Sequence, residues 1–384
     1  MSLISKIKGL RHRLLLELYR LLPLQNNTVL FWSFDFNAYS CNPKYIARRL
    51  AELYPGKFDI CWVFDVSVDV PPDFPYRYVR YFSPEYMKQI ATAKVLVCNS
   101  RINEKRYCFR KRKGQFYLQT WHGSIGPKHI ERDAEAQLDP RYVATAKRDS
   151  QICDLMLADC PAFARICRES CWYDGEVLVS GMPRCDLFFQ DGRAELRKSL
   201  GVPPNVRLAV YAPTFRKDLR DRELLDCGNL CSALKNRFGG DWLVLRSVHP
   251  NLRHQPMEEP PHCMLMRDRD IQELIHISEV MVSDYSSAML DAAMAGKKVF
   301  LLAPDLEEYR VDERGFYYDI GETPFPLCQS NDALRQSIET FDEQAYQAAV
   351  DVFFRRFGLG QDGKASDRAA ARIAQVCGLA PTEP

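Results

Sequence analysis

The sequence predicts an α/β protein of two domains, each built on a parallel sheet flanked by helices. Apolar stretches of strand length alternate with helical stretches from residue 28 onward, and the same rhythm starts again near residue 206. The strands of the second half are short and apolar and end in Gly, Pro or polar residues, as expected for a sheet that is buried on both faces. A chain of 384 residues is also too long for one typical core.

The first domain is predicted over residues 28–183. Pro43 lies in the first turn of a helix over 42–55, where proline is favoured. The stretch QFYLQTWHG (115–123) is a strand that runs into a turn containing glycine. The other predicted elements are strands at 28–34, 58–65, 76–82, 94–100 and 176–180 and a helix at 84–93.

The second domain is predicted over residues 184–384, because a strand ends at residue 180 and a polar helix follows GMPRCD (181–186). Its last helix can cross back to the first domain. Two parallel α/β domains of similar size leave a cleft at the carboxyl ends of their strands, where such sheets bind ligands. The predicted elements are strands at 206–214, 241–250, 279–284 and 297–304 and helices at 285–296 and 367–377.

Residues 1–27 contain a predicted basic amphipathic helix. Residues 1–23 carry five basic residues and one acidic residue, a local charge of +4. Apolar side chains recur every three or four positions and line one helical face: Ile4, Ile7, Leu10, Leu14, Leu18 and Leu21. Such a helix can lie in the headgroup region of an anionic membrane, or it can pack against its own domain, and the sequence leaves both open.

Composition argues against several classes of function. A net charge of +2 argues against a nucleic-acid partner held on a broad basic surface. The fourteen cysteines include no CxxC pair, which favours reduced, buried thiols over a metal site. There is no P-loop and no DxD metal pair in a plausible loop, and the GxGxxG spacing of Gly358, Gly360 and Gly363 follows no predicted strand. Neither a dinucleotide nor Mg²⁺-dependent chemistry is therefore indicated, and no cofactor is expected. Without a transmembrane-length apolar run or a secretory signal, we expect a cytoplasmic protein, peripheral on the inner face of the cell membrane.

Two histidines are candidates for catalysis because they follow strands of different domains. His122 comes after the strand 115–121 and precedes Gly123, which lets the backbone turn sharply. His249 ends the strand 241–248 and precedes Pro250. An isolated histidine is more often structural, but two at corresponding strand ends favour a function.

The segment SDYSSAMLDAAMAG (283–296) is the strongest local signal for an anion site. A strand ends at Asp284, and Ser286 and Ser287 begin the helix that follows. Hydroxyls and unpaired N–H groups at a helix N-terminus suit a phosphate, although Ser286 can equally serve only as the helix cap. Thr214 and Arg216 end another strand of the same domain, and arginine suits bidentate contact with phosphate.

Together these segments resemble the CDP-glycerol glycerophosphotransferase family, the transferases of teichoic-acid and capsule polymers. The resemblance covers about residues 28–370, and the combination of motifs is specific although each motif alone is weak. Cys185 stands where the family often has Asn, a change that can affect packing alone. WHGSIGPK replaces the commoner WHGTPLK, so the donor or acceptor alditol can differ. The matching segments are 33–46, 119–133, 181–186, 211–216, 249–250, 270–291, 305–319 and 362–368.

The resemblance implies a GT-B-like fold, with two Rossmann-like doubly wound domains facing a cleft and the nucleotide held mainly by the C-terminal one. It implies transfer of glycerol phosphate from CDP-glycerol to a hydroxyl of a lipid-linked polymer, with release of CMP. His122 would deprotonate the acceptor hydroxyl, and His249 would contact the diphosphate and stabilise charge on the leaving CMP. The substrate-binding residues would be Gly123, Thr214, Arg216, Asp284, Ser286 and Ser287.

Three alternatives remain open. The donor can be CDP-ribitol, since family members also transfer ribitol phosphate. A nucleotide-sugar glycosyltransferase or sugar epimerase shares the two-domain architecture, and fold alone cannot separate these activities. A non-enzymatic scaffold is the third, although intact candidates at His122, His249, Ser286 and Ser287 argue against it.

Overall fold

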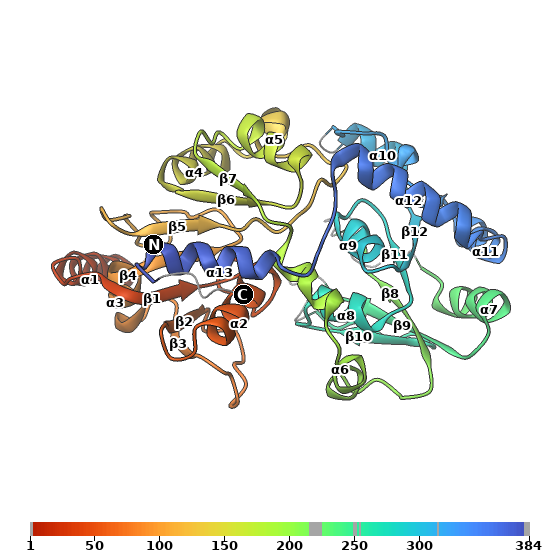
Figure 1. Ribbon diagram of the computed structural model, residues 1–384, viewed down its shortest axis with the longest axis horizontal. Helices are drawn as coiled ribbons and strands as arrows, with labels where there is room; N and C mark the ends of the chain where they lie inside the picture. Colours follow the sequence, from red (N-terminus) through yellow and green to blue (C-terminus); the bar gives the residue numbers. More distant parts are fainter. Residues whose placement is uncertain (1–2, 215–224, 249–251, 253–254, 313–314, 380–384) are drawn as a thin grey trace.

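The computed structural model describes residues 3–214, 225–248, 252, 255–312 and 315–379. Two parallel sheets form the cores of the two halves of the molecule (Figure 1), which confirms the predicted fold class. The first sheet contains β1 (Gln25–Phe31), β2 (Asp59–Phe64), β3 (Arg77–Arg80), β4 (Ala93–Cys98), β5 (Phe116–Gln119), β6 (Leu155–Ala158) and β7 (Glu176–Val179). The second contains β8 (Arg207–Tyr211), β9 (Trp242–Ser247), β10 (Cys263–Met266), β11 (Val280–Ser283), β12 (Lys298–Leu302) and β13 (Leu327–Cys328).

Both sheets are doubly wound. The strand order is β3-β2-β1-β4-β5-β6-β7 in the first and β10-β9-β8-β11-β12-β13 in the second. In each, the chain starts in the middle, builds outward on one side, and then returns to build on the other. Among the described residues, neighbouring strands within the two sheets pair in parallel; Val29 of β1 pairs with Val95 of β4, and Val280 of β11 pairs with Ala209 of β8. Ligands of such sheets bind outside the carboxyl ends of the strands where the order reverses, here between β1 and β4 and between β8 and β11.

Local sequence signals account for the ends of the helices. Ser83 accepts a hydrogen bond from the N–H of Tyr86, and Pro84 occupies the first turn of α3. Gly358 ends α12 in a left-handed conformation, with φ 68°. The helices are α1 (Leu3–Tyr19), α2 (Cys41–Leu53), α3 (Pro84–Thr92), α4 (Pro140–Ile152), α5 (Pro161–Ser170), α6 (Arg193–Ser199), α7 (Cys227–Phe238), α8 (Ile271–Ile277), α9 (Ala288–Met294), α10 (Leu306–Asp312), α11 (Asn331–Glu339), α12 (Glu343–Phe357) and α13 (Ala365–Val376).

The last helix packs against the first sheet although it follows the second one in the chain. Ala369 and Ile373 of α13 are buried in the same cluster as residues of β1 and α2, and Figure 1 shows α13 (blue) among the red and orange elements. The start of this helix is capped from elsewhere, because the carboxylate of Asp186 accepts the N–H groups of Ala365 and Ser366 at 3.1 and 2.6 Å. The GMPRCD and DGKASDR segments are therefore neighbours in space.

Helix α1 lies on α3 at one end of the first half. Its Leu16 is buried, whereas its Leu14 and Leu18 are exposed by 59% and 60%, and Leu21 in the turn that follows is exposed by 82%. In the described part of the chain, no helix has both the length and the apolar character needed to cross a bilayer. The fourteen cysteines are free thiols, and all but Cys108 and Cys377 are buried.

Candidate active site

The first half of the site is the turn after β5. The strand ends at Gln119, two residues earlier than predicted, because Trp121 adopts a left-handed backbone with φ 53°. The side chain of His122 is exposed, and its Nδ1 lies 2.7 Å from the carbonyl oxygen of Asn99. A carbonyl can only accept a hydrogen bond, so Nδ1 carries the proton of the neutral ring and Nε2 keeps its lone pair. Nε2 therefore has the form that a general base requires.

The surroundings of His122 favour its neutral form. Its ring stacks on Trp121, with centroids 5.0 Å apart, and meets the ring of Phe34 at 5.8 Å. Dehydration by these groups lowers the pKa of His122 below its usual value, the hydrogen bond to Asn99 opposes that decrease, and the charge of Arg184 adds to it. Because the side chain still reaches solvent, the lowered pKa reflects partial dehydration of an accessible ring.

The second half of the site is the turn between β11 and α9. The helix begins at Ala288, so Ser287 and not Ser286 directly precedes it. The hydroxyl of Ser287 makes no capping hydrogen bond, whereas Oγ of Ser286 accepts the N–H of Ala288 at 3.3 Å. The two serines therefore differ: Ser286 supports the helix, and the hydroxyl of Ser287 has no capping role.

The two halves touch at two glycines. A Cβ atom on Gly123 would lie 3.4 Å from Oγ of Ser287, and one on Gly126 would lie 3.1 Å from Cβ of Ser287. The backbone after His122 thus passes directly over Ser287, which the absence of side chains at these two positions permits. The structure brings together His122, Gly123 and Ser287, which the sequence places at separate strand ends.

Asp284 and Thr214 form a second connection, within the second sheet. Asp284 is 1% exposed, and its carboxylate accepts the N–H of Thr214 at 2.9 Å and the hydroxyl of Thr214 at 2.7 Å. The carboxylate also accepts the N–H of Tyr285 at 2.6 Å. It therefore fixes the loop after β8 beside the turn that contains Ser286 and Ser287, which we call the serine turn. The remaining predicted site residues, Arg216 and His249, lie outside the described residues.

A short antiparallel pairing also holds the two halves together, and sequence analysis did not predict it. Lys128 and Phe316 form a β-bridge. The N–H of His129 donates to the carbonyl of Gly315 at 2.6 Å, and the N–H of Tyr317 donates to Pro127 at 2.7 Å. The segment that continues from His122 is thus anchored to the second half. The signal in the sequence was the presence of both segments among the matching motifs, without any indication that they pair.

Buried ion pairs join the same two halves. The guanidinium of Arg184 contacts the carboxylate of Asp291 through two hydrogen bonds of 2.8 and 3.1 Å, and both residues are 1% exposed. The buried amine of Lys44 lies 3.2 Å from Asp270. Lys44 lies in the matching segment 33–46 and Arg184 in 181–186, so these two motifs contribute to the junction between the halves.

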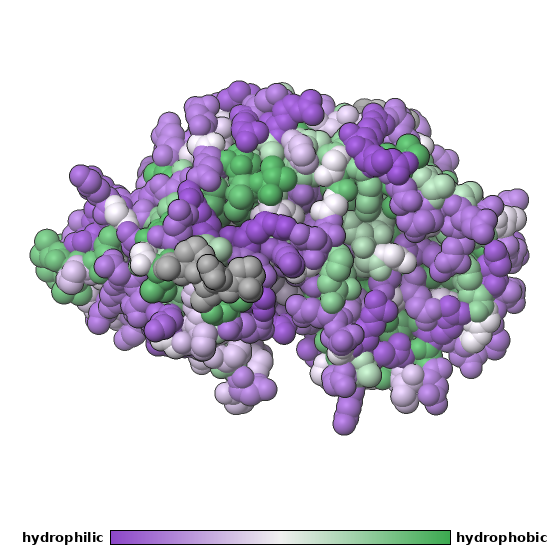
Figure 2. Space-filling model, in the orientation of Figure 1, coloured by the Kyte–Doolittle hydropathy of each residue, from purple (hydrophilic) through white to green (hydrophobic). Residues whose placement is uncertain are grey.

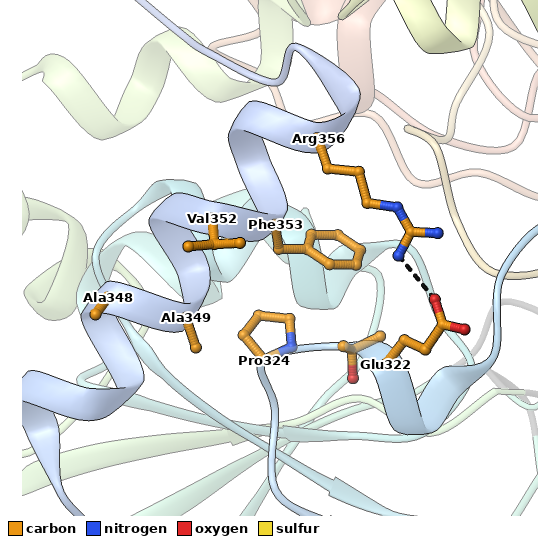
Figure 3. Close-up of a pocket in the computed structure, with 8 residues that line it drawn as sticks. Glu322, Pro324, Ala348, Ala349, Val352, Phe353 and Arg356 are labelled. Carbon is orange, nitrogen blue, oxygen red and sulfur yellow. Dashed lines mark hydrogen bonds and ion pairs between the residues drawn. The ribbon is translucent and has the colours of Figure 1, made fainter.

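A hollow elsewhere in the second half contains none of these residues (Figure 3). It has a volume of about 420 Å³ and lies between α12 and the segment 322–324. Val352 and Phe353 line one side, and an ion pair of 2.7 Å joins Arg356 to Glu322. The hollow holds no histidine, cysteine or serine, so we do not assign the chemistry to it. Across the described ranges, no three side chains of His, Cys, Asp or Glu gather as metal ligands would.

The chain matches a known protein family over most of its length. The model of a family described as CDP-Glycerol:Poly(glycerophosphate) glycerophosphotransferase matches residues 14–375. The chain is 26% identical over 394 residues to the teichoic acid poly(glycerol phosphate) polymerase of Bacillus subtilis (strain 168), covering 96% of this chain and 52% of that protein. With the corresponding polymerase of Staphylococcus epidermidis it is 29% identical over 379 residues, covering 91% and 51%. The chain therefore spans about half the length of these two relatives.

A shorter relative and two solved structures complete the comparison. The teichoic acid glycerol-phosphate transferase of Staphylococcus aureus is 29% identical over 367 residues, covering 90% of this chain and 92% of that protein. The structure of the wall teichoic acid polymerase TagF matches with a TM-score of 0.82 and 26% identity over 98% of both chains. A putative UDP-N-acetylglucosamine 2-epimerase from Listeria monocytogenes, 12% identical over 91% of this chain and 96% of that one, matches in fold with a TM-score of 0.52.

Proposed function

The chain belongs to the CDP-glycerol:poly(glycerophosphate) glycerophosphotransferase family, and from that premise we propose that it transfers glycerol phosphate from CDP-glycerol to a hydroxyl of a lipid-linked cell-surface polymer. The polymer is of the teichoic-acid or capsule type, and CMP is released. The observation that carries the proposal is the contact between the turn of His122 and Ser287. It sets a histidine with a free lone pair beside a hydroxyl at the strand ends of the opposite half.

In the proposed reaction, Nε2 of His122 takes the proton of the acceptor hydroxyl. The acceptor oxygen forms a bond to the phosphorus that carries the glycerol, and the bond from that phosphorus to the bridging oxygen breaks. The bridging oxygen leaves with its electron pair as part of CMP. Base catalysis of this kind contributes on the order of 10²–10⁴-fold, and positioning and charge stabilisation supply much of the remainder in phosphoryl transfer.

The second half would hold the diphosphate of the donor. We assign the phosphate contact to Ser287, whose hydroxyl has no capping role, with Ser286 and Thr214 beside it. The family resemblance adds Arg216 as a charged partner and His249 at the leaving CMP. The carboxylate of Asp284 already accepts hydrogen bonds from Thr214 and Tyr285, so in this proposal it acts on the donor by holding Thr214 in place.

The proposal includes attachment to the inner face of an anionic membrane through α1. Apolar residues form the left edge of the molecule in Figure 2, at the position of α1 in Figure 1. A second basic segment lies beside them: residues 104–113 carry six basic residues and one acidic residue, and Arg112 donates to the carbonyl of Leu22 at 2.9 Å. Apolar side chains next to a basic segment suit the headgroup region of anionic lipid.

A panel of donors tests the function. The protein is incubated with CDP-glycerol, CDP-ribitol or a UDP-sugar and a short synthetic glycerol phosphate acceptor, and released CMP or UDP is measured. We expect CMP release from CDP-glycerol that depends on the acceptor. Faster release from CDP-ribitol would identify a ribitol phosphate transferase, and release of UDP would identify a glycosyltransferase. If the folded protein releases no nucleotide from any donor, the result would contradict the proposal and favour a non-enzymatic scaffold.

A further inference from the structure

A buried arginine contacts the same indole ring as the candidate base. Arg101 is 7% exposed, and its guanidinium carbon lies 5.4 Å from the ring centre of Trp121. The rings of Trp121 and His122 are stacked, with centroids 5.0 Å apart and an angle of 22° between their planes. Trp121 therefore contacts both the cation and the imidazole. A cation on an aromatic face is attracted by the ring quadrupole, and the attraction is stronger when both groups are dehydrated.

Arg101 is held in this position from several sides. Its Nη1 donates to Oδ2 of Asp149 and to Oγ of Ser150, each at 2.9 Å. Its Nη2 lies 3.2 Å from Oε2 of Glu131 and donates to the carbonyl of Cys171 at 3.3 Å. Partners in several directions leave the guanidinium little freedom, so the contact with Trp121 is fixed as well.

Glu131 connects this network to the electrostatics of His122. It is 2% exposed and has φ 53°, a conformation that costs energy for a residue other than glycine and that its surroundings must impose. Its Oε1 accepts a hydrogen bond from the hydroxyl of Tyr142 at 2.5 Å. The negative charge of Glu131 raises the pKa of His122, against the effect of dehydration.

We infer that Arg101 and Glu131 are positioning residues for His122 and act through the indole of Trp121. The inference rests on the proposed role of His122 as the base. Arg101 fixes Trp121, and Trp121 then fixes the plane of the imidazole. Glu131 keeps Arg101 in place and supplies negative charge that makes Nε2 a stronger base.

Of the other charged groups around His122, one raises the pKa of its ring and another lowers it. Asp35, beyond β1, raises the pKa of the ring as Glu131 does, and Arg184 lowers it. The carbonyl of Asn99 fixes the proton on Nδ1. Apolar residues often stabilise a core as well as a buried ion pair does. Stability alone therefore does not require charged groups here, and an effect on the neighbouring base accounts for them.

The test is a titration of His122 in the full chain, followed by NMR of histidines labelled at Cε1 and assigned with His122→Asn. Glu131→Gln keeps an oxygen to accept from Tyr142 and removes the charge. We expect the pKa of His122 to fall by roughly half a unit. The acid limb of kcat/KM should move by the same amount, and kcat should fall while KM for CDP-glycerol stays nearly constant. Asp270→Asn is the matched control, because Asp270 is also buried, pairs with a cation and accepts a tyrosine hydroxyl.

A second pair of variants tests the path through the indole. Trp121→Phe keeps an aromatic face for Arg101 and His122, and Trp121→Leu removes it. We expect Trp121→Phe to retain most of kcat and Trp121→Leu to lose it, with both variants folded by circular dichroism. An unchanged pKa of His122 in Glu131→Gln, or equal kcat in the two Trp121 variants, would overturn the inference. Full transfer activity in His122→Asn would instead remove the proposed base, whatever the titration shows.

Discussion

Asn99 and Asp284 occupy the same position in their two sheets and make the same contact. Each directly follows the fourth strand of its sheet, and each accepts the N–H of the residue three positions after the first strand. Asn99 accepts from Phe34 at 2.8 Å, and Asp284 accepts from Thr214 at 2.9 Å. The strand order reverses between β1 and β4 in one sheet and between β8 and β11 in the other. The two halves use the same contact at these places, although no internal repeat is visible in the sequence. One contact supports the site of His122, and the other supports the serine turn.

The pH dependence of the reaction follows from the state of His122. The folded protein lowers the pKa of this ring below its usual value of about 6.5, and the neutral ring is the active form. We expect kcat/KM to rise with pH through a midpoint below that value and then to level off. A pH series under saturating acceptor checks this. Activity that falls as the pH rises through 6.5 would contradict a basic role for the ring.

Ser287→Ala should weaken donor binding more than it weakens the fold. Loss of a hydrogen bond to a charged phosphate costs about 1.5–3 kcal/mol, which corresponds to roughly a tenfold to hundredfold weaker Kd for CDP-glycerol. The melting temperature should hardly change, because this hydroxyl makes no capping bond. Calorimetric titration gives the affinity.

Ser286→Ala is the matched control for Ser287→Ala. It removes an oxygen that accepts from the N–H of Ala288, so the main expected effect is a loss of about 1 kcal/mol of stability. If Ser287→Ala leaves the affinity unchanged and lowers the melting temperature, the serine turn is only the start of a helix.

Asp291→Asn should destabilise the junction between the halves. It leaves the buried guanidinium of Arg184 without its charged partner, and breaking a buried ion pair costs about 3–5 kcal/mol. Urea unfolding checks this. Asp59→Asn is the control, since Asp59 pairs with Arg77 in an exposed position and such pairs contribute about 1 kcal/mol or less. Equal destabilisation by the two substitutions would argue against a tight junction at Arg184.

Membrane attachment should depend on the exposed face of α1 and on the turn that follows it. Replacing Leu18 and Leu21 with Glu should weaken binding to vesicles of anionic phosphatidylglycerol by roughly tenfold or more. These substitutions leave the buried Leu16 in place, whereas deletion of the whole helix would remove it from the core. Added salt should weaken binding by the wild type. Val352→Glu, an exposed apolar site on α12, is the control, and an equal loss in that variant would contradict a specific role for α1.

Much of the fold could be predicted from sequence because strands of a buried parallel sheet are short apolar runs with polar ends. The predicted strand over 28–34 illustrates the limit. The observed β1 spans Gln25–Phe31, and Phe34, Asp35 and Phe36 all have left-handed backbones. The aromatic side chains of Phe34 and Phe36 resemble those of a strand, while the hydrogen bond that the N–H of Phe34 donates to Asn99, distant in sequence, helps to fix the turn.

The candidate site could be predicted only in part. His122 and Ser287 were identifiable because each follows a strand. Their proximity depends on Gly123 and Gly126, whose lack of a side chain becomes meaningful only once the two halves are assembled. The partners of buried charges were beyond sequence reasoning for a similar reason. Arg184 and Asp291 both lie in recognisable motifs, but neither periodicity nor composition indicates which carboxylate a buried arginine meets.

The most direct test of the proposed transfer is the mass of the acceptor after incubation with CDP-glycerol. Wild-type protein should add whole glycerol phosphate units to a synthetic lipid-linked acceptor and release one CMP for each unit. His122→Asn should reduce the rate at least about 100-fold while it stays folded, and His262→Asn, at an exposed histidine of the second half, should react like the wild type. An acceptor of unchanged mass with the wild type, or equal extension by His122→Asn, would contradict the account.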